Sequence, residues 1–138
     1  MNLQDIATVS GKGGLFKVIK PTKTGVILES LDDRKARLVT GMNQKVSVLA
    51  EISVYTTGEQ ETMPLLDVFL KIKEEFDDDP GVDKNSDAEE LKGFLAHILP
   101  DYDRDRVYVS DIKKMAHWYL IIYQNAPDIL TEEAKEES

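Results

Sequence analysis

Hydrophobic and polar residues alternate along the first part of the chain, as they do on strands with one buried face. Residues 36–40 and 52–56 show this pattern, residues 14–20 and 26–31 are rich in β-forming residues, and turn-forming Pro, Gly and Asp residues separate the four runs. We predict four antiparallel strands that form a small SH3-like barrel or a curled sheet. In its first hairpin loop, Gly25 is expected to supply a positive φ.

Two further segments of this part are expected to be helical. Residues 1–8 are predicted to form a short helix across the open end of the sheet. Residues 47–50 are predicted to form a single helical turn before the last strand.

Beyond about residue 62 the apolar residues recur every three or four positions, as on one face of a helix. The spacing predicts three helices. The expected start residues are Thr62 with Pro64 in the first turn, then Ser86 or Asp87, then Ser110. The three apolar faces consist of Leu65, Val68, Phe69, Ile72 and Phe76; of Leu91, Phe94, Leu95, Ile98 and Leu99; and of Ile112, Met115, Ala116, Tyr119 and Tyr123.

The change of period predicts an α+β fold with a boundary near residues 58–63. We expect a small antiparallel β module at 1–60, a three-helix module at 61–126, and a mobile acidic tail at 127–138.

Composition narrows the functional classes. The chain has 138 residues, no cysteine and a net charge of -9. Residues 1–62 hold eight Lys or Arg and seven Asp or Glu, whereas the remainder holds nine and nineteen. An acidic chain repels phosphate backbones, so nucleic-acid binding is disfavoured for the chain as a whole. The missing thiols exclude disulfides, thiolate zinc sites and thiol catalysis.

The same composition bears on localisation. The longest apolar run, residues 118–123, is too short to cross a bilayer, and residues 1–8 lack a secretory signal pattern. The absence of cysteine suits a reducing compartment. We predict a cytoplasmic protein that binds no membrane.

Two segments resemble reactive motifs without completing them. Ser10-Gly11-Lys12-Gly13-Gly14 resembles a phosphate-binding loop, but a strand rather than a helix is predicted to follow it, so we interpret it as a turn. Asp101, Asp103 and Asp105 have calcium-loop spacing, but Arg106 and Ile112 replace the required Gly and Glu.

No other segment supplies reactive groups at catalytic spacing. His97 and His117 have no second ligand nearby in sequence. We predict no catalytic site, no metal and no cofactor, and therefore not an enzyme.

The leading functional hypothesis is a non-catalytic protein-binding or scaffolding module. From Trp118 to Tyr123 the third helix is apolar all round, so either the β module or a partner chain, including a second copy, covers its outer face. Tyr and Arg are enriched in binding hot spots. The candidate partner-binding residues are Tyr102, Arg104, Arg106, Tyr108, Trp118 and Ile121.

The alternative hypothesis is a nucleic-acid-associated regulator that uses a basic face of the β module, with Phe16 or Tyr55 for stacking. Its candidate residues are Lys12, Lys17, Lys20, Lys23, Arg34, Lys35, Arg37 and Lys45.

Three stretches resemble a known family: residues 10–17, residues 25–32, and the string from Asp101 to Tyr108 with residues 110–114. They are similar to bacterial proteins described as domains of unknown function. The resemblance covers about residues 2–125 and implies a bacterial cytoplasmic protein with an N-terminal β module and a C-terminal helical module. It implies no activity or ligand.

Overall fold

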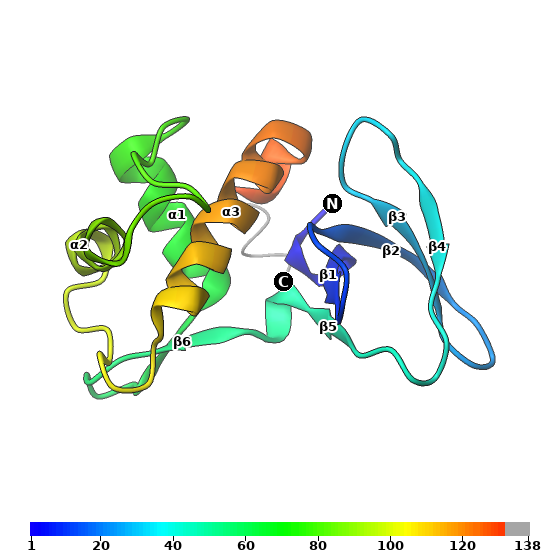
Figure 1. Cartoon of the computed structure of the whole chain (residues 1–138), viewed down its shortest axis with the longest axis horizontal. Helices are drawn as coiled ribbons and strands as arrows, with labels where there is room; N and C mark the ends of the chain where they lie inside the picture. The colour runs from blue at the N-terminus through cyan, green and yellow to red at the C-terminus, as the bar shows by residue number, and fades with distance from the viewer. Residues whose placement is uncertain (132–138) are drawn as a thin grey trace. The chain divides into compact units, whose positions relative to one another are not determined.

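The computed structural model describes residues 1–131. The chain divides into two compact units, and Figure 1 labels most of their helices and strands. Met1–Glu51, together with the chain from Ile121 onward, forms the first unit, and Ile52–Leu120 forms the second. The predicted boundary near residues 58–63 therefore falls inside the second unit.

The first unit contains an open five-stranded antiparallel sheet, in the order β4-β3-β2-β1-β5. The α+β class is confirmed. Among the described strands, β4 and β5 are the two edges and are not paired with each other, so the SH3-like barrel is not confirmed. The elements are η1 (Leu3–Asp5), β1 (Ile6–Val9), β2 (Phe16–Pro21), β3 (Val26–Ser30), β4 (Arg37–Val39), β5 (Val46–Val48) and η2 (Leu49–Glu51).

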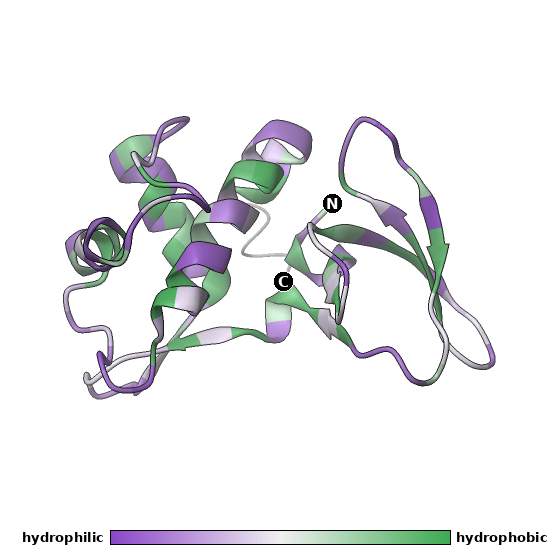
Figure 2. Cartoon of the chain, viewed as in Figure 1, coloured by the Kyte–Doolittle hydropathy of each residue, from purple (hydrophilic) through white to green (hydrophobic). Residues whose placement is uncertain are grey.

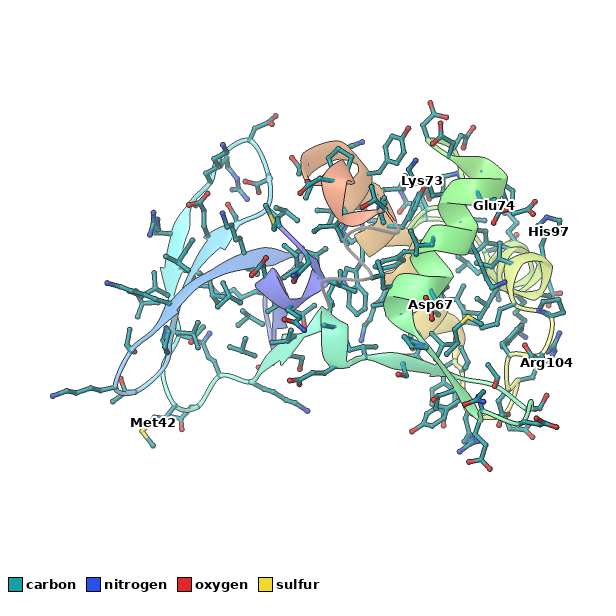
Figure 3. The ribbon with its side chains drawn as sticks, turned by 180° about the vertical axis from the view of Figure 1, so that it is seen from behind. Met42, Asp67, Lys73, Glu74, His97 and Arg104 are labelled. Atoms are coloured by element: carbon teal, nitrogen blue, oxygen red, sulfur yellow. The ribbon has the colours of Figure 1, made fainter. Side chains whose placement is uncertain are left out.

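Alternation of residues along β2 to β4 places one face of this sheet in the core. Val9, Phe16 and Leu28 form the buried cluster. Four partly buried residues pack against it: Val18, Val26, Leu38 and Val46. Figure 2 shows the hydrophilic loop that joins β3 to β4, and Figure 3 shows Met42 extending from the loop between β4 and β5, where it is 83% exposed.

The predicted helix over residues 1–8 is wrong except for the short turn η1. Ile6–Val9 is a strand that pairs with β2 on one side and β5 on the other. Three of its four residues are buried, so neither face is polar and the period of two is absent. A short run of this kind cannot be distinguished from a buried helical segment by periodicity.

Gly25 is required for close approach rather than for a positive φ. A Cβ at this position would lie 1.8 Å from the carbonyl oxygen of Thr40. Positive φ angles occur instead at Gly11 and Gly14, in the turn between β1 and β2. The interpretation of residues 10–14 as a turn is confirmed, because an antiparallel strand follows it.

The second unit combines a two-stranded sheet with helices. The predicted strand at 52–56 exists as β6, but it pairs with β7 in a separate sheet. All three predicted helices are present. The elements are β6 (Ser53–Tyr55), β7 (Thr62–Pro64), α1 (Leu65–Phe76), α2 (Ala88–Ile98) and α3 (Val109–Asn125), the last of which continues into the first unit.

The helix starts differ in detail from the prediction. Pro64, not Thr62, is the N-cap of α1. Asp87 caps α2 and accepts a hydrogen bond from the Glu90 amide at 2.9 Å, as predicted. Ser110 lies inside α3, where the Asp111 carboxylate instead accepts from the Tyr108 amide.

Aromatic contacts join the helices of the second unit. The rings of Phe69 and Tyr119 lie 6.1 Å apart, and those of Phe76 and Phe94 lie 5.7 Å apart. The Tyr119 hydroxyl donates to the Asp77 carbonyl at the end of α1, at 2.5 Å. These pairs link α1 to α3 and α1 to α2.

The first five residues of the predicted acidic tail, 127–131, lie within the described part of the chain. Pro127–Ile129 forms the 3-10 turn η3, and Ile129 and Leu130 are buried. Residues 132–138 lie outside the described residues. No helix within residues 1–131 is long and apolar enough to span a bilayer.

Candidate functional site

One edge of β6 is left partly open. On the other edge, the Thr56 amide donates to Glu61 at 2.8 Å and the Leu65 amide donates to Ile52 at 3.0 Å. Backbone groups of an antiparallel strand face alternate edges. Ser53 and Tyr55 therefore direct their N–H and C=O groups away from β7.

The segment before α3 covers only one end of this edge. The Asp103 amide donates to the Tyr55 carbonyl at 2.9 Å, and the Thr57 amide donates to Asp101 at 2.8 Å. The chain then turns away, because the Val107 amide bonds to the Asp103 carbonyl at 2.9 Å. Within residues 1–131, the Tyr55 N–H and both backbone groups of Ser53 have no hydrogen-bond partner.

A pocket of about 190 Å³ lies beside this edge. Buried apolar side chains from four segments form its inner wall, and the half-buried Trp118 closes one side. The inner wall comprises Val54, Leu65, Val107 and Met115, and the rim comprises Ser53, Tyr55, Arg106, Asp111 and Lys114.

Arg106 is fixed at the rim by two interactions. Its Cζ lies 4.3 Å from the centre of the Tyr55 ring, and its Nε donates to Asp103 Oδ2 at 2.9 Å. The hydrogen bond from Arg106, followed by that from the Asp105 amide, lowers the pKa of the Asp103 carboxyl. Asp103 in turn raises the pKa of the Arg106 guanidinium.

Two charged side chains of α3, Asp111 and Lys114, lie at the pocket rim and differ in their interactions. The Asp111 carboxylate accepts a hydrogen bond from the Tyr108 amide at 2.9 Å. Lys114 is exposed and makes no ion pair in the described part of the chain. Lys114 is therefore the rim cation available to an incoming carboxylate.

Of the predicted partner-binding residues, only Arg106 and Trp118 meet at this pocket. Tyr108 is 65% exposed but lies outside it, and Ile121 is half-buried in the part of α3 that belongs to the first unit.

Tyr102 and Arg104 make contacts within the second unit, and a binding role for them stays a prediction. Tyr102 is only 3% exposed. Arg104, between α2 and α3 in Figure 3, lies over the Tyr102 ring at 4.2 Å. Its Nη1 donates to the carbonyls of Pro100 and Tyr102 at 2.9 and 2.7 Å.

The sequence did not identify Ser53 or Lys114 as candidate binding residues, and it suggested Tyr55 only for stacking on a nucleic-acid base. The alternation Ser53-Val54-Tyr55 places Tyr55 opposite the buried Val54, which is a sequence signal for an exposed aromatic residue. Nothing local in the sequence shows where the neighbouring segment leaves the strand edge.

The predicted basic face belongs to the first unit. Lys17, Glu29 and Arg37 occupy paired positions on β2, β3 and β4, with 3.6 Å between Arg37 and Glu29. Arg34 pairs with Asp32 at 3.2 Å. Phe16 is buried and cannot stack on a base. Lys20 also lies on β2, and the remaining cations, Lys12, Lys23, Lys35 and Lys45, lie in the segments between strands. Nucleic-acid binding stays a prediction.

Among the described residues, no group of three or more His, Asp or Glu side chains converges as a metal site. In the segment with calcium-loop spacing, the Asp103 carboxylate accepts a hydrogen bond from Arg106.

The two units match known families. A family model described as Domain of unknown function (DUF6852) matches residues 52–122, and a second, Domain of unknown function (DUF5606), matches residues 3–49. The solution NMR structure of a protein from Bacteroides vulgatus is similar, with a TM-score of 0.71 and 37% sequence identity. The match covers 91% of this chain and 88% of that chain. No curated protein matches the sequence. The resemblance to bacterial domains of unknown function, with a β part before a helical part, is confirmed.

Proposed function

We propose, for a chain that belongs to the family described as Domain of unknown function (DUF6852), a function as a non-catalytic protein-binding module. The observation that carries this proposal is the apolar pocket rimmed by Tyr55 and Arg106 and walled by Trp118. Tyr, Arg and Trp are the residue types most enriched in binding hot spots.

The size of the pocket favours a protein partner over a cofactor. Sites for small molecules and cofactors usually enclose about 300–1,000 Å³, whereas this pocket encloses about 190 Å³. A cavity of about 150 Å³ holds a benzene molecule. The pocket therefore suits one large apolar side chain that projects from a partner surface.

Arg106 and Tyr55 at the rim would orient the partner side chain that enters the pocket. Arg106 is held by Asp103 and Tyr55, so little of its side-chain freedom remains to be lost on binding. Tyr55 is 44% exposed and presents a rigid aromatic surface at the same rim. A pre-organised rim of this kind favours specific protein contact.

Site-specific photo-crosslinking in bacterial cells tests the proposal. Replacing Tyr55 with p-benzoylphenylalanine puts the reactive group at the rim. The control puts it at Met42, which is 83% exposed, lies outside the pocket and is not among the candidate binding residues. We expect discrete protein adducts from the Tyr55 position, and at least fivefold weaker adducts after Trp118→Ala in a variant that retains its circular dichroism spectrum.

Equal adducts from both positions, or adducts indifferent to Trp118→Ala and to Arg106→Ala, would reject the pocket as the binding site. The mass of each adduct separates a second copy of this chain from a different protein. Either identity supports protein binding.

A further inference from the structure

We infer that the partner binds as an extended segment that adds a strand to the open edge of β6. This segment inserts one apolar side chain into the pocket and places an acidic side chain at Lys114. The inference rests on the proposed function and specifies the mode of binding and the chemistry of the partner.

The first support is the backbone of β6. Ser53 presents one N–H and one C=O, and Tyr55 presents one N–H, on an edge where no described residue bonds to them. An antiparallel strand exchanges two hydrogen bonds with every second residue of its neighbour. An added strand would therefore pair fully with Ser53 and reach the Tyr55 amide.

The second support is the position at which residues 101–103 stop covering the edge of β6. Residues 101–103 run along the same edge and bridge to Thr56 and Tyr55. Asp103 then stops the pairing, because its carboxylate accepts from the Asp105 amide at 2.9 Å and from Arg106. The pocket lies beside the β6 positions that this segment leaves uncovered.

β6 is only three residues long, and short edge strands resist strand addition, but its edge carries no Lys, Pro or bulge, which are the other common protections. The β6–β7 pairing is regular. Arg106 is the nearest cation, but Asp103 and the Tyr55 ring hold it in place.

The third support is the face of α3 across the groove. Asp111, Lys114, Met115 and Trp118 follow the i, i+3, i+4, i+7 spacing of one helix face and line the pocket together. Side chains of an added strand alternate, so every second one faces this helix. Met115 and Trp118 provide apolar contact, and Lys114 provides the unpaired cation, so the partner segment combines an apolar residue with Asp or Glu.

Selection of random heptapeptides displayed on phage against the immobilised full-length chain tests this inference. A selected peptide is then synthesised, and its dissociation constant is measured by fluorescence anisotropy. We expect selected sequences that pair one Leu, Met or Phe with a nearby Asp or Glu. Lys114→Glu should weaken binding at least fivefold.

Ser53→Pro is the decisive variant, because it removes the edge N–H and keeps the apolar wall residues Val54, Leu65, Val107 and Met115 unchanged. We expect at least tenfold weaker binding, whereas the matched control Ser53→Ala keeps the N–H and should stay within twofold. Should Ser53→Pro not fold, N-methylation of single peptide amides gives the same test on the wild-type chain. Methylation at alternate positions should abolish binding.

Each outcome that contradicts the inference identifies which part of it is wrong. If Trp118→Ala abolishes peptide binding while Ser53→Pro and N-methylation do not, strand addition is wrong and protein binding stands. A failure to select any peptide also rejects strand addition, and the Tyr55 crosslinks then decide the proposed function independently. A dimer that Ser53→Pro dissociates, detected by light scattering, would assign the edge to a second copy instead.

Discussion

The guanidinium of Arg106 lies over the ring of Tyr55, with 4.3 Å between its Cζ atom and the ring centre. The same guanidinium donates to the Asp103 carboxylate. One cation therefore joins strand β6 to the turn that precedes α3, at the rim of the pocket. The contact of Arg106 with Asp103 should be measurable through the titration of Asp103, and its contact with Tyr55 through the binding of a partner.

Removing this cation should raise the pKa of Asp103. The hydrogen bond from Arg106 is the main reason that the pKa lies below the ordinary value of 3.8, so Arg106→Ala should move it back toward 3.8. Carbon-13 NMR titration of the carboxyl measures the change. Asp32, whose pKa is lowered first by the Ser30 hydroxyl, is the control and should not move.

The same pair predicts a dependence of stability on pH. The pKa of Asp103 is lower in the folded than in the unfolded chain, so its contribution is complete above the unfolded value and is lost as pH falls through the folded value. Arg106→Ala should therefore lower the free energy of unfolding at pH 7 and have little effect well below the ordinary pKa of 3.8. A difference that grows in acid would contradict this assignment.

Arg104 should affect stability and not partner binding. Arg104→Ala removes hydrogen bonds to the carbonyls of Pro100 and Tyr102, each worth about 0.5–1.5 kcal/mol. Because Arg104 is exposed, we expect a loss near the low end of the sum, about 1 kcal/mol in urea unfolding, and faster hydrogen exchange in the turn after Tyr102. Lys113→Ala, an exposed cation on α3, is the control. An unchanged stability with a lost partner would restore Arg104 as a binding residue.

Gly25 should tolerate no side chain. Gly25→Ala places a Cβ 1.8 Å from the Thr40 carbonyl oxygen, which is backbone and cannot rotate away. Overpacking of this kind costs about 1–3 kcal/mol or more. Gly13→Ala is the matched control, because no atom lies within 4 Å of its Cβ and its φ is not positive. Equal unfolding midpoints in urea for the two variants would refute the close approach.

The sequence predicted the helices well because their information is local. The apolar residues of α1 that the 3.6 period selected, such as Val68, Phe69 and Ile72, are buried, and the Asp87 cap is where it was expected. The sheet was predicted less well. β1 pairs with β5, so Thr8 lies opposite Ser47, and no pattern within either segment shows that pairing.

The candidate site shows the same limit. Arg106 and Trp118 were identifiable by residue type, because Arg and aromatic residues favour binding surfaces. The open edge at Ser53 could not be identified from the sequence, because it depends on where residues 101–103 leave β6. Tyr102 was selected by residue type as well, and its burial, at 3% exposed, is a property that residue type does not reveal.

Thr40 closes the other side of the contact made by Gly25, and its hydroxyl should be essential for that end of the sheet. Thr40 is 2% exposed, and its Oγ1 accepts from the Val26 amide at 3.1 Å. Thr40→Val keeps the shape of the side chain but leaves this amide without its acceptor, which costs about 1–3 kcal/mol. Thr40→Ser keeps the acceptor and should lose only about 0.8 kcal/mol for the missing methyl group. Urea unfolding and the exchange rate of the Val26 amide distinguish the two variants. If Thr40→Val were as stable as Thr40→Ser and protected the Val26 amide equally, the hydroxyl would have no structural role and packing alone would hold β3 against the end of β4.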